Sequence, residues 1–303
     1  MGERKCILSC AILVAVIMPA AGAVSADEQK STVSFNEYDL IQTLQASPIN
    51  KLERQGHSQE EIMEIKGALL ETKLVKRASL SQDKLRGLGY TADEISILKE
   101  IETTGQVDLS EAQLRAIAGT CTGTIVPNSA GKSEYRVSYE WEWDHAPVIC
   151  YKDSFAIRWE AMGSDGLPVD STAGSLTVGY VEYYDYDGYF SAIETLQPNR
   201  NNIEFNVVKF DFRVGSGTPE VSTYAKRGSG HVQIQKDAGV TRDFYYLKVG
   251  ALYGHTVVNI GFPSLSVSAG GIGIGFSGGL STDNIGGDKC KIDLNNQKTA
   301  ISG

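Results

Sequence analysis

The chain alternates apolar and polar residues most regularly in two segments of its second half. Residues 135–143 place Tyr, Val, Tyr, Trp and Trp at every other position, and residues 155–161 do the same with Phe, Ile, Trp and Ala. A period of two is typical of a strand with one buried face. Both segments are therefore predicted to be half-buried β-strands.

Other short segments of the same character follow, punctuated by turn signals such as Asp165-Gly166 and Asp187-Gly188. They lie near residues 175–184, 189–196, 203–213, 220–225, 231–236, 243–251, 254–260, 264–268, 272–276 and 289–294. No segment of helical period interrupts them. Many short strands with such turns predict an antiparallel β-sandwich domain over residues 120–303, jelly-roll or immunoglobulin-like.

The segment before residue 119 has a helical pattern that repeats. Seven residues that begin with Leu52 recur 33 positions later, beginning with Leu85. Each copy has a glycine suited to a left-handed helix end, and then Ser58 or Thr91 followed three positions later by glutamate, which predicts a capping box. The sequence thus predicts an α+β multidomain chain with a helical module at residues 47–119. This module is either a pro-region or partner-binding unit, or a capped helical domain without a ligand.

The run from Leu85 to Ile95, LRGLGYTADEI, carries a family resemblance. It is similar to a helix-Gly-Tyr-Thr-helix element that follows the signal peptide in uncharacterised secreted proteins of Gram-positive bacteria. The resemblance implies secretion and a Gram-positive source, and it implies no activity.

The first 26 residues have the three parts of a signal peptide. A short charged start at residues 3–5 precedes an apolar run at residues 7–18, and small residues lead to a cleavage site after Ala26. We expect the mature chain to begin at Asp27, to be secreted or extracellular, and to start with a linker at residues 27–46.

Charge and hydropathy exclude some partners. The formal net charge of the chain is −9, and loss of two basic residues and one acidic residue with the signal makes the mature chain −10. An acidic chain is a poor partner for nucleic acid, which requires clustered Lys and Arg. No apolar run after Ala26 is long enough to span a bilayer, so we expect no transmembrane segment.

Three of the five cysteines, Cys121, Cys150 and Cys290, lie outside the signal segment. An oxidising compartment favours one disulfide and one leftover thiol, and the spacing leaves the pairing open.

Tyrosines concentrate between residues 180 and 189. Alternation places Tyr180, Glu182, Tyr184 and Tyr186 on one face of a strand. Aromatic rings beside a carboxylate suit a sugar, because the ring packs on C–H groups and the carboxylate accepts hydrogen bonds from hydroxyl groups. These four residues are the candidate ligand-binding set, although tyrosine also favours ordinary strands.

The same segment holds Asp185, Asp187 and Glu194 at positions three, five and twelve of a calcium-binding loop. Position one is Tyr183, which has no carboxylate, and a tight hairpin turn at Asp187-Gly188 explains the pattern as well. Calcium is the one cofactor that the sequence suggests, and no cofactor is required.

Three classes of function remain open. The favoured class is a secreted or cell-surface-associated, non-enzymatic protein that binds a glycan or a protein. The second is a secreted hydrolase, in which His255, Asp144 or Glu194 would have to converge in one pocket. The third is a pore-forming or membrane-active protein, in which the uncharged run 264–281 forms an inserting hairpin. The sequence leaves the oligomeric state open.

Overall fold

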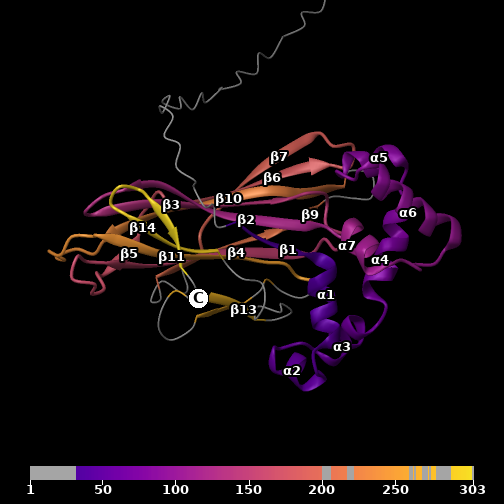
Figure 1. Cartoon of the computed structure of the whole chain (residues 1–303), viewed down its shortest axis with the longest axis horizontal. Coiled ribbons are helices and arrows are strands. Elements are labelled where there is room, and N and C mark those ends of the chain that lie inside the picture. Colours follow the sequence, from indigo (N-terminus) through magenta and orange to yellow (C-terminus); the bar gives the residue numbers. More distant parts are fainter. Residues whose placement is uncertain are drawn as a thin grey trace, which may run out of the picture.

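The structure is a computed structural model that describes residues 32–199, 206–216, 222–258, 262, 264–267, 272, 274–277 and 288–301. Within these residues it has seven helices and two large antiparallel sheets, so the chain is α+β (Figure 1). The predicted signal peptide lies outside the described residues.

The helices follow one another between the first two strands and lie at one end of the sheets (Figure 1). They are α1 (Glu37–Ala46), α2 (Ile49–Arg54), α3 (Gln59–Lys66), α4 (Leu69–Ala78), α5 (Gln82–Gly87), α6 (Ala92–Thr104) and α7 (Glu111–Ile117).

The larger sheet has eight described strands, and its main path runs in the order β1-β2-β3-β10-β6-β7. These strands are β1 (Thr32–Asn36), β2 (Thr120–Ala130), β3 (Glu134–Trp143), β10 (Thr223–Lys236), β6 (Val178–Asp185) and β7 (Phe190–Leu196), and β5 (Ser171–Ala173) and β9 (Gly215–Ser216) also pair with β10. In this order β10 lies between β3 and β6, both of which come much earlier in the chain.

The smaller sheet has five described strands in the order β15-β14-β11-β4-β8. These are β15 (Lys298–Ala300), β14 (Asp288–Asp293), β11 (Tyr246–Gly254), β4 (Lys152–Met162) and β8 (Val207–Arg213). A separate hairpin consists of β12 (Ser264–Val267) and β13 (Ile274–Ser277).

Both sheets contribute one face to a shared apolar core. The apolar residues predicted for β3 and β4 from alternation are buried in this core, Trp143 and Trp159 among them. Glycines in the larger sheet make room for the large rings. A Cβ on Gly228 would lie 2.6 Å from the ring of Trp141, so only glycine fits opposite that side chain.

The 33-residue repeat predicted from sequence is present in the helices. Ser58 with Glu61, and Thr91 with Glu94, form the expected capping boxes. The glycine before each box is left-handed, with φ of +94° at residue 56 and +97° at residue 89.

Equivalent lysines in the two repeats also bind equivalent carbonyl groups. Lys66 Nζ donates to the carbonyls of Gln45 and Ser47. Thirty-three residues later, Lys99 Nζ donates to the carbonyls of Ala78 at 3.0 Å and Leu80 at 2.6 Å. The repeat therefore extends from the sequence pattern to the contacts that close each helical pair.

Two expectations about chain organisation need correction. Residues 32–46, placed in a linker from sequence, form β1 and α1, because β1 pairs with β2 and the side chain of Asn36 caps α1 by accepting from the N–H of Tyr38 at 3.0 Å. Two separate strands were expected at 220–225 and 231–236, but residues 223–225 and 231–236 belong to a single strand, β10. A bulge at Lys226, between the paired residues Ala225 and Arg227, interrupts its alternation without ending it.

The helices pack closely onto the sheets. Their buried residues share a second core with Val148, Ile149, Tyr224 and Val257. Arg77 of α4 is buried and donates to the carbonyls of Ala146 at 3.1 Å and Pro147 at 2.7 Å, both in the segment after β3.

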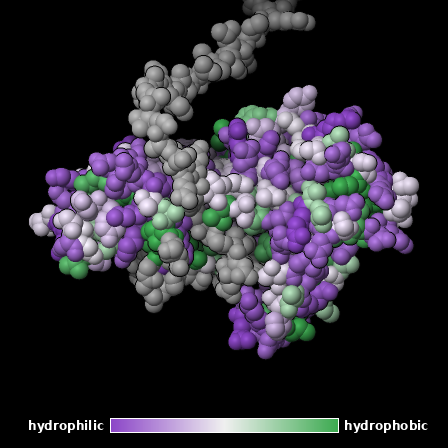
Figure 2. All heavy atoms as spheres, in the orientation of Figure 1, coloured by the Kyte–Doolittle hydropathy of each residue, from purple (hydrophilic) through white to green (hydrophobic). Residues whose placement is uncertain are grey.

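The described surface in Figure 2 is mostly hydrophilic with scattered apolar patches. None of the described helices is long and apolar enough to cross a membrane.

The uncharged hairpin packs on the sheet face that is turned away from the shared core. Phe276 of β13 is buried there against Ala156, Val207 and Leu252, with Leu265 and Ile274 partly buried beside it. In this position the apolar face of the hairpin is covered by the protein itself. Parts of the run 264–281 lie outside the described residues.

Candidate functional site

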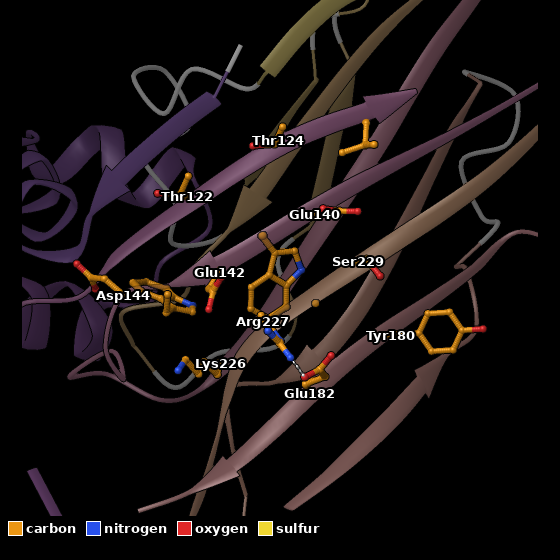
Figure 3. A pocket seen from close by; sticks show the side chains of 14 residues that line it. Thr122, Thr124, Glu140, Glu142, Asp144, Tyr180, Glu182, Lys226, Arg227 and Ser229 are labelled. Atoms are coloured by element: carbon orange, nitrogen blue, oxygen red, sulfur yellow. Dashed lines mark hydrogen bonds and ion pairs between the residues drawn. The ribbon is translucent and has the colours of Figure 1, made fainter. Parts of the chain in front are cut away.

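A groove with a volume of about 990 Å³ crosses the outward face of the larger sheet (Figure 3). The strands β2, β3, β10 and β6 supply its lining. Four acidic side chains line it, Glu140, Glu142, Asp144 and Glu182, together with hydroxyl groups such as that of Ser229.

The antiparallel register assembles this lining in rows across the sheet. Arg227 of β10 pairs with Glu142 of β3 on one side and with Glu182 of β6 on the other. Two residues further along β10, Ser229 pairs with Glu140 and Tyr180 in the same way. Because directly paired residues point to the same face, each row gathers three side chains from three strands.

Charge in the groove is unevenly paired. Arg227 donates to Glu182 Oε2 from Nε at 2.8 Å, its Nη2 lies 2.7 Å from the same oxygen, and this hydrogen bond raises the pKa of Arg227 (Figure 3). Lys226 lies over the ring of Tyr184, with Nζ 5.2 Å from the ring centroid. With four carboxylates against two cations in its lining, the groove is acidic.

The structure divides the predicted tyrosine set. Tyr180, which is 37% exposed, and Glu182 line the groove. Tyr184 and Tyr186 instead pack against the helical core. The backbone of Tyr186 touches α5 so closely that a Cβ on Gly87 would lie 2.3 Å from the Tyr186 carbonyl oxygen. Two of the four predicted residues therefore line the groove, and the other two are partly buried beside the helices.

Two of the three candidate metal ligands, Asp185 and Glu194, accept hydrogen bonds from groups of the protein. Asp185 Oδ1 accepts from the N–H groups of Asp187 at 3.0 Å and Tyr189 at 2.8 Å, and Gly188 is left-handed, which confirms the predicted hairpin turn. Glu194 accepts from the hydroxyl of Tyr183 at 2.8 Å. Among the described residues, no group of three or more His, Cys, Asp or Glu side chains is placed to hold a metal ion.

His255 lies in a buried charged cluster between the sheets and α1. Its Nδ1 is 2.8 Å from Asp153 Oδ2 and its Nε2 is 3.3 Å from Glu37 Oε1, and all three side chains are fully buried. Burial favours the neutral ring, but the charges and hydrogen bonds of Asp153 and Glu37 outweigh this and raise the pKa of His255 to about 10. The imidazolium therefore bridges the two carboxylates. The backbone N–H groups of Val148 and Ile149 also donate to Glu37, and the N–H of Thr256 donates to Asp153.

The hydrolase residues expected from sequence do not meet. His255 contacts Asp153 and Glu37, whereas Asp144 accepts from the N–H of Thr120 and Glu194 from Tyr183. The expected disulfide is also not formed, since no two of Cys121, Cys150 and Cys290 are joined by an S–S bond in the structure. Burial raises the pKa of Cys150 to about 12.

Sequence reasoning missed most of the groove. Glu140 and Glu142 alternate with tryptophans in β3, so their outward direction was predictable. The neighbours that complete each row, Arg227 and Ser229, come from β10, and no local pattern identifies β10 as the partner of β3.

Comparisons with known proteins give no relative that assigns a function. No family model matches the chain, and no curated protein matches it. Among solved structures, it is similar to a chain described as "AvmM Catalyzes Macrocyclization in Alchivemycin A Biosynthesis", with 12% sequence identity, a TM-score of 0.21, and coverage of 45% of this chain and 74% of that chain. A similarity at this TM-score carries no argument about fold or function.

Proposed function

We propose that this chain is a secreted or cell-surface protein that binds a glycan in the groove of the larger sheet. In this proposal the two sheets are the layers of a β-sandwich, and the helices form a module at one end of it. The single observation that carries the proposal is the groove itself, in which an exposed tyrosine lies beside carboxylate, hydroxyl and guanidinium groups.

The chemistry of the lining suits a sugar chain. Tyr180 offers an aromatic surface to the C–H groups of a sugar ring, and its hydroxyl stays in water. Glu140 and Glu142 accept hydrogen bonds from sugar hydroxyl groups, and Thr122 and Thr124 both donate and accept. The volume of the groove, about 990 Å³, also lies within the range of about 300–1,000 Å³ that is typical of ligand sites.

The charge of the groove narrows the type of glycan. Four carboxylates repel uronic acids, sulfated sugars and phosphate-linked polymers, because like charges placed together are unfavourable. Neutral glycans and glycans with free amino groups remain. A protein ligand is the competing outcome of the test below.

Retention on immobilised glycans tests the proposal. Tyr180→Ala should weaken binding of a neutral or amino-sugar glycan at least about fivefold, because truncation of an aromatic side chain that anchors a ligand costs more than about 1 kcal/mol and about 1.4 kcal/mol is a factor of ten. Tyr189→Ala is the matched control, since Tyr189 is 71% exposed but does not line the groove. Equal retention of wild type and folded Tyr180→Ala, or binding of a protein instead of any glycan, would overturn the proposal.

A further inference from the structure

A chain of hydrogen bonds ends at a serine in the groove. Ser229 Oγ lies 3.2 Å from Nε2 of His231, on the same face of β10. His231 Nδ1 lies 2.6 Å from Oγ of Ser138, which is directly opposite it on β3. Ser138 in turn donates to Asn128 Oδ1 at 2.6 Å. Four side chains from β2, β3 and β10 are thus connected.

The direction of these hydrogen bonds decides which nitrogen of His231 carries the proton. Ser138 has one hydroxyl hydrogen and gives it to Asn128, so the contact with His231 must be donated by Nδ1–H. Nε2 is then the acceptor, and it receives the hydroxyl hydrogen of Ser229. The ring is also poised to act as a base at neutral pH, because burial lowers the pKa of His231.

We propose that Ser229 is a nucleophile activated by His231, and that the groove cleaves an ester carried by its ligand, an O-acyl group on a sugar. A nucleophile, a base within hydrogen-bond reach and a third group that orients the base are the parts that covalent catalysis requires. Ser229 supplies the first, His231 the second, and Ser138, held by Asn128, is the positioning residue. The inference goes beyond binding and departs from the non-enzymatic function expected from sequence.

Besides the ester, the reaction needs only water. Ser229 Oγ attacks the ester carbonyl carbon while its proton passes to His231 Nε2. The bond from that carbon to the sugar oxygen breaks, and Nε2 returns the proton to the sugar oxygen. Water then attacks the acyl-serine in the same manner, which releases a carboxylic acid and restores the Ser229 hydroxyl.

Two neighbours of Ser229 support this role. Arg227 lies two residues before it on the same face and is held there by its ion pair with Glu182, and the N–H groups that this pair leaves over can donate to the carbonyl oxygen as negative charge develops on it. Tyr180 pairs directly with Ser229, and its ring centroid lies 5.8 Å from that of His231. A sugar held on Tyr180 would therefore place a substituent close to Ser229.

A fluorophosphonate probe tests the proposal on the mature protein without knowledge of the substrate. The wild type should gain one adduct, which peptide mass spectrometry should locate at Ser229. Ser229→Ala should gain none, and His231→Gln should be labelled at least about 100-fold more slowly, since general-base catalysis contributes a factor of about 10²–10⁴. Ser191→Ala, which removes an exposed serine of β7, is the control and should be labelled like the wild type.

Circular dichroism melts establish that each variant is folded. Absence of an adduct on folded wild type, an adduct at another residue, or unchanged labelling of His231→Gln would each overturn the proposal. Glycan retention measured on the same samples separates it from the binding function. Retention without labelling refutes only the nucleophile, and labelling without retention refutes only the glycan site.

Discussion

Replacement of His255 by asparagine tests the buried contacts that join α1 to the sheets. The substitution leaves Glu37 and Asp153 as two fully buried carboxylates without the imidazolium between them. Loss of one partner from a buried ion pair typically costs about 3–5 kcal/mol. The pKa has the same sign, because the charges and hydrogen bonds of the two carboxylates raise the pKa of His255 and so favour the charged ring in the folded protein. We expect His255→Asn to lower the free energy of unfolding by about 3–5 kcal/mol.

Urea unfolding at pH 7, followed by far-ultraviolet circular dichroism, measures this loss. His231→Asn is the control, because His231 is only partly buried and makes neutral hydrogen bonds, each of which contributes about 1 kcal/mol. A loss below about 1 kcal/mol for His255→Asn would refute the assignment of a charged, stabilising cluster.

The same cluster determines a pH dependence with a definite sign. The pKa of His255 is higher in the folded protein than in the unfolded chain, so its stabilisation is complete below pH 6.5 and is lost as the pH rises toward about 10. Across this window the wild type should lose up to about 1.4 kcal/mol per pH unit from this group, and His255→Asn should lack that contribution. Parallel curves for the two proteins would contradict the argument.

Three other predictions concern a helix–turn contact, the uncharged hairpin and the cysteines. Gly87→Ala should destabilise the protein by about 1–3 kcal/mol although alanine favours helices, because the new Cβ would meet the Tyr186 carbonyl, and Gly67→Ala should change the melting temperature much less. Ile274→Lys should destabilise the protein by about 1–2 kcal/mol, and the wild type should release no dye from liposomes. If the wild type does release dye, and the lysine abolishes this release without lowering stability, the result would instead support membrane insertion. Alkylation of denatured protein without reductant should modify Cys121, Cys150 and Cys290 together, and a protected pair would reveal a disulfide.

Local patterns predicted local structure well. Alternation around Trp141 and Trp159 located two central strands, and the pairs Ser58–Glu61 and Thr91–Glu94 located two helix starts, because each signal lies within a few residues of the structure it specifies. The strand β1 was missed because its five residues carry too short a pattern, and it is stabilised by pairing with β2, which begins 84 residues after the end of β1.

The candidate site depends on contacts that sequence does not encode locally. Tyr180 and Glu182 were correctly placed on one face of a strand, but the strands beside them follow from sheet order, not from spacing. His255 and Glu37 are 218 residues apart in the chain and yet hydrogen-bonded. Alternation predicted which face of the strand Tyr186 lies on, and on that ground it was assigned to the ligand surface. Alternation does not show that α5 packs against this residue.

The position of β1 bears on whether the helices are a removable pro-region. β1 precedes the helices and pairs with β2, which follows them, so both ends of the helical segment are anchored in the same sheet. Glu37 binds the backbone at Val148 and Ile149, and the buried Arg77 binds the carbonyls after β3. A cut near Gly119 would therefore leave two pieces that share a core and stay associated. Release of the β-sheet part would require loss of β1 from the sheet edge and exposure of His255, so a pro-region role demands unfolding of this interface in addition to cleavage.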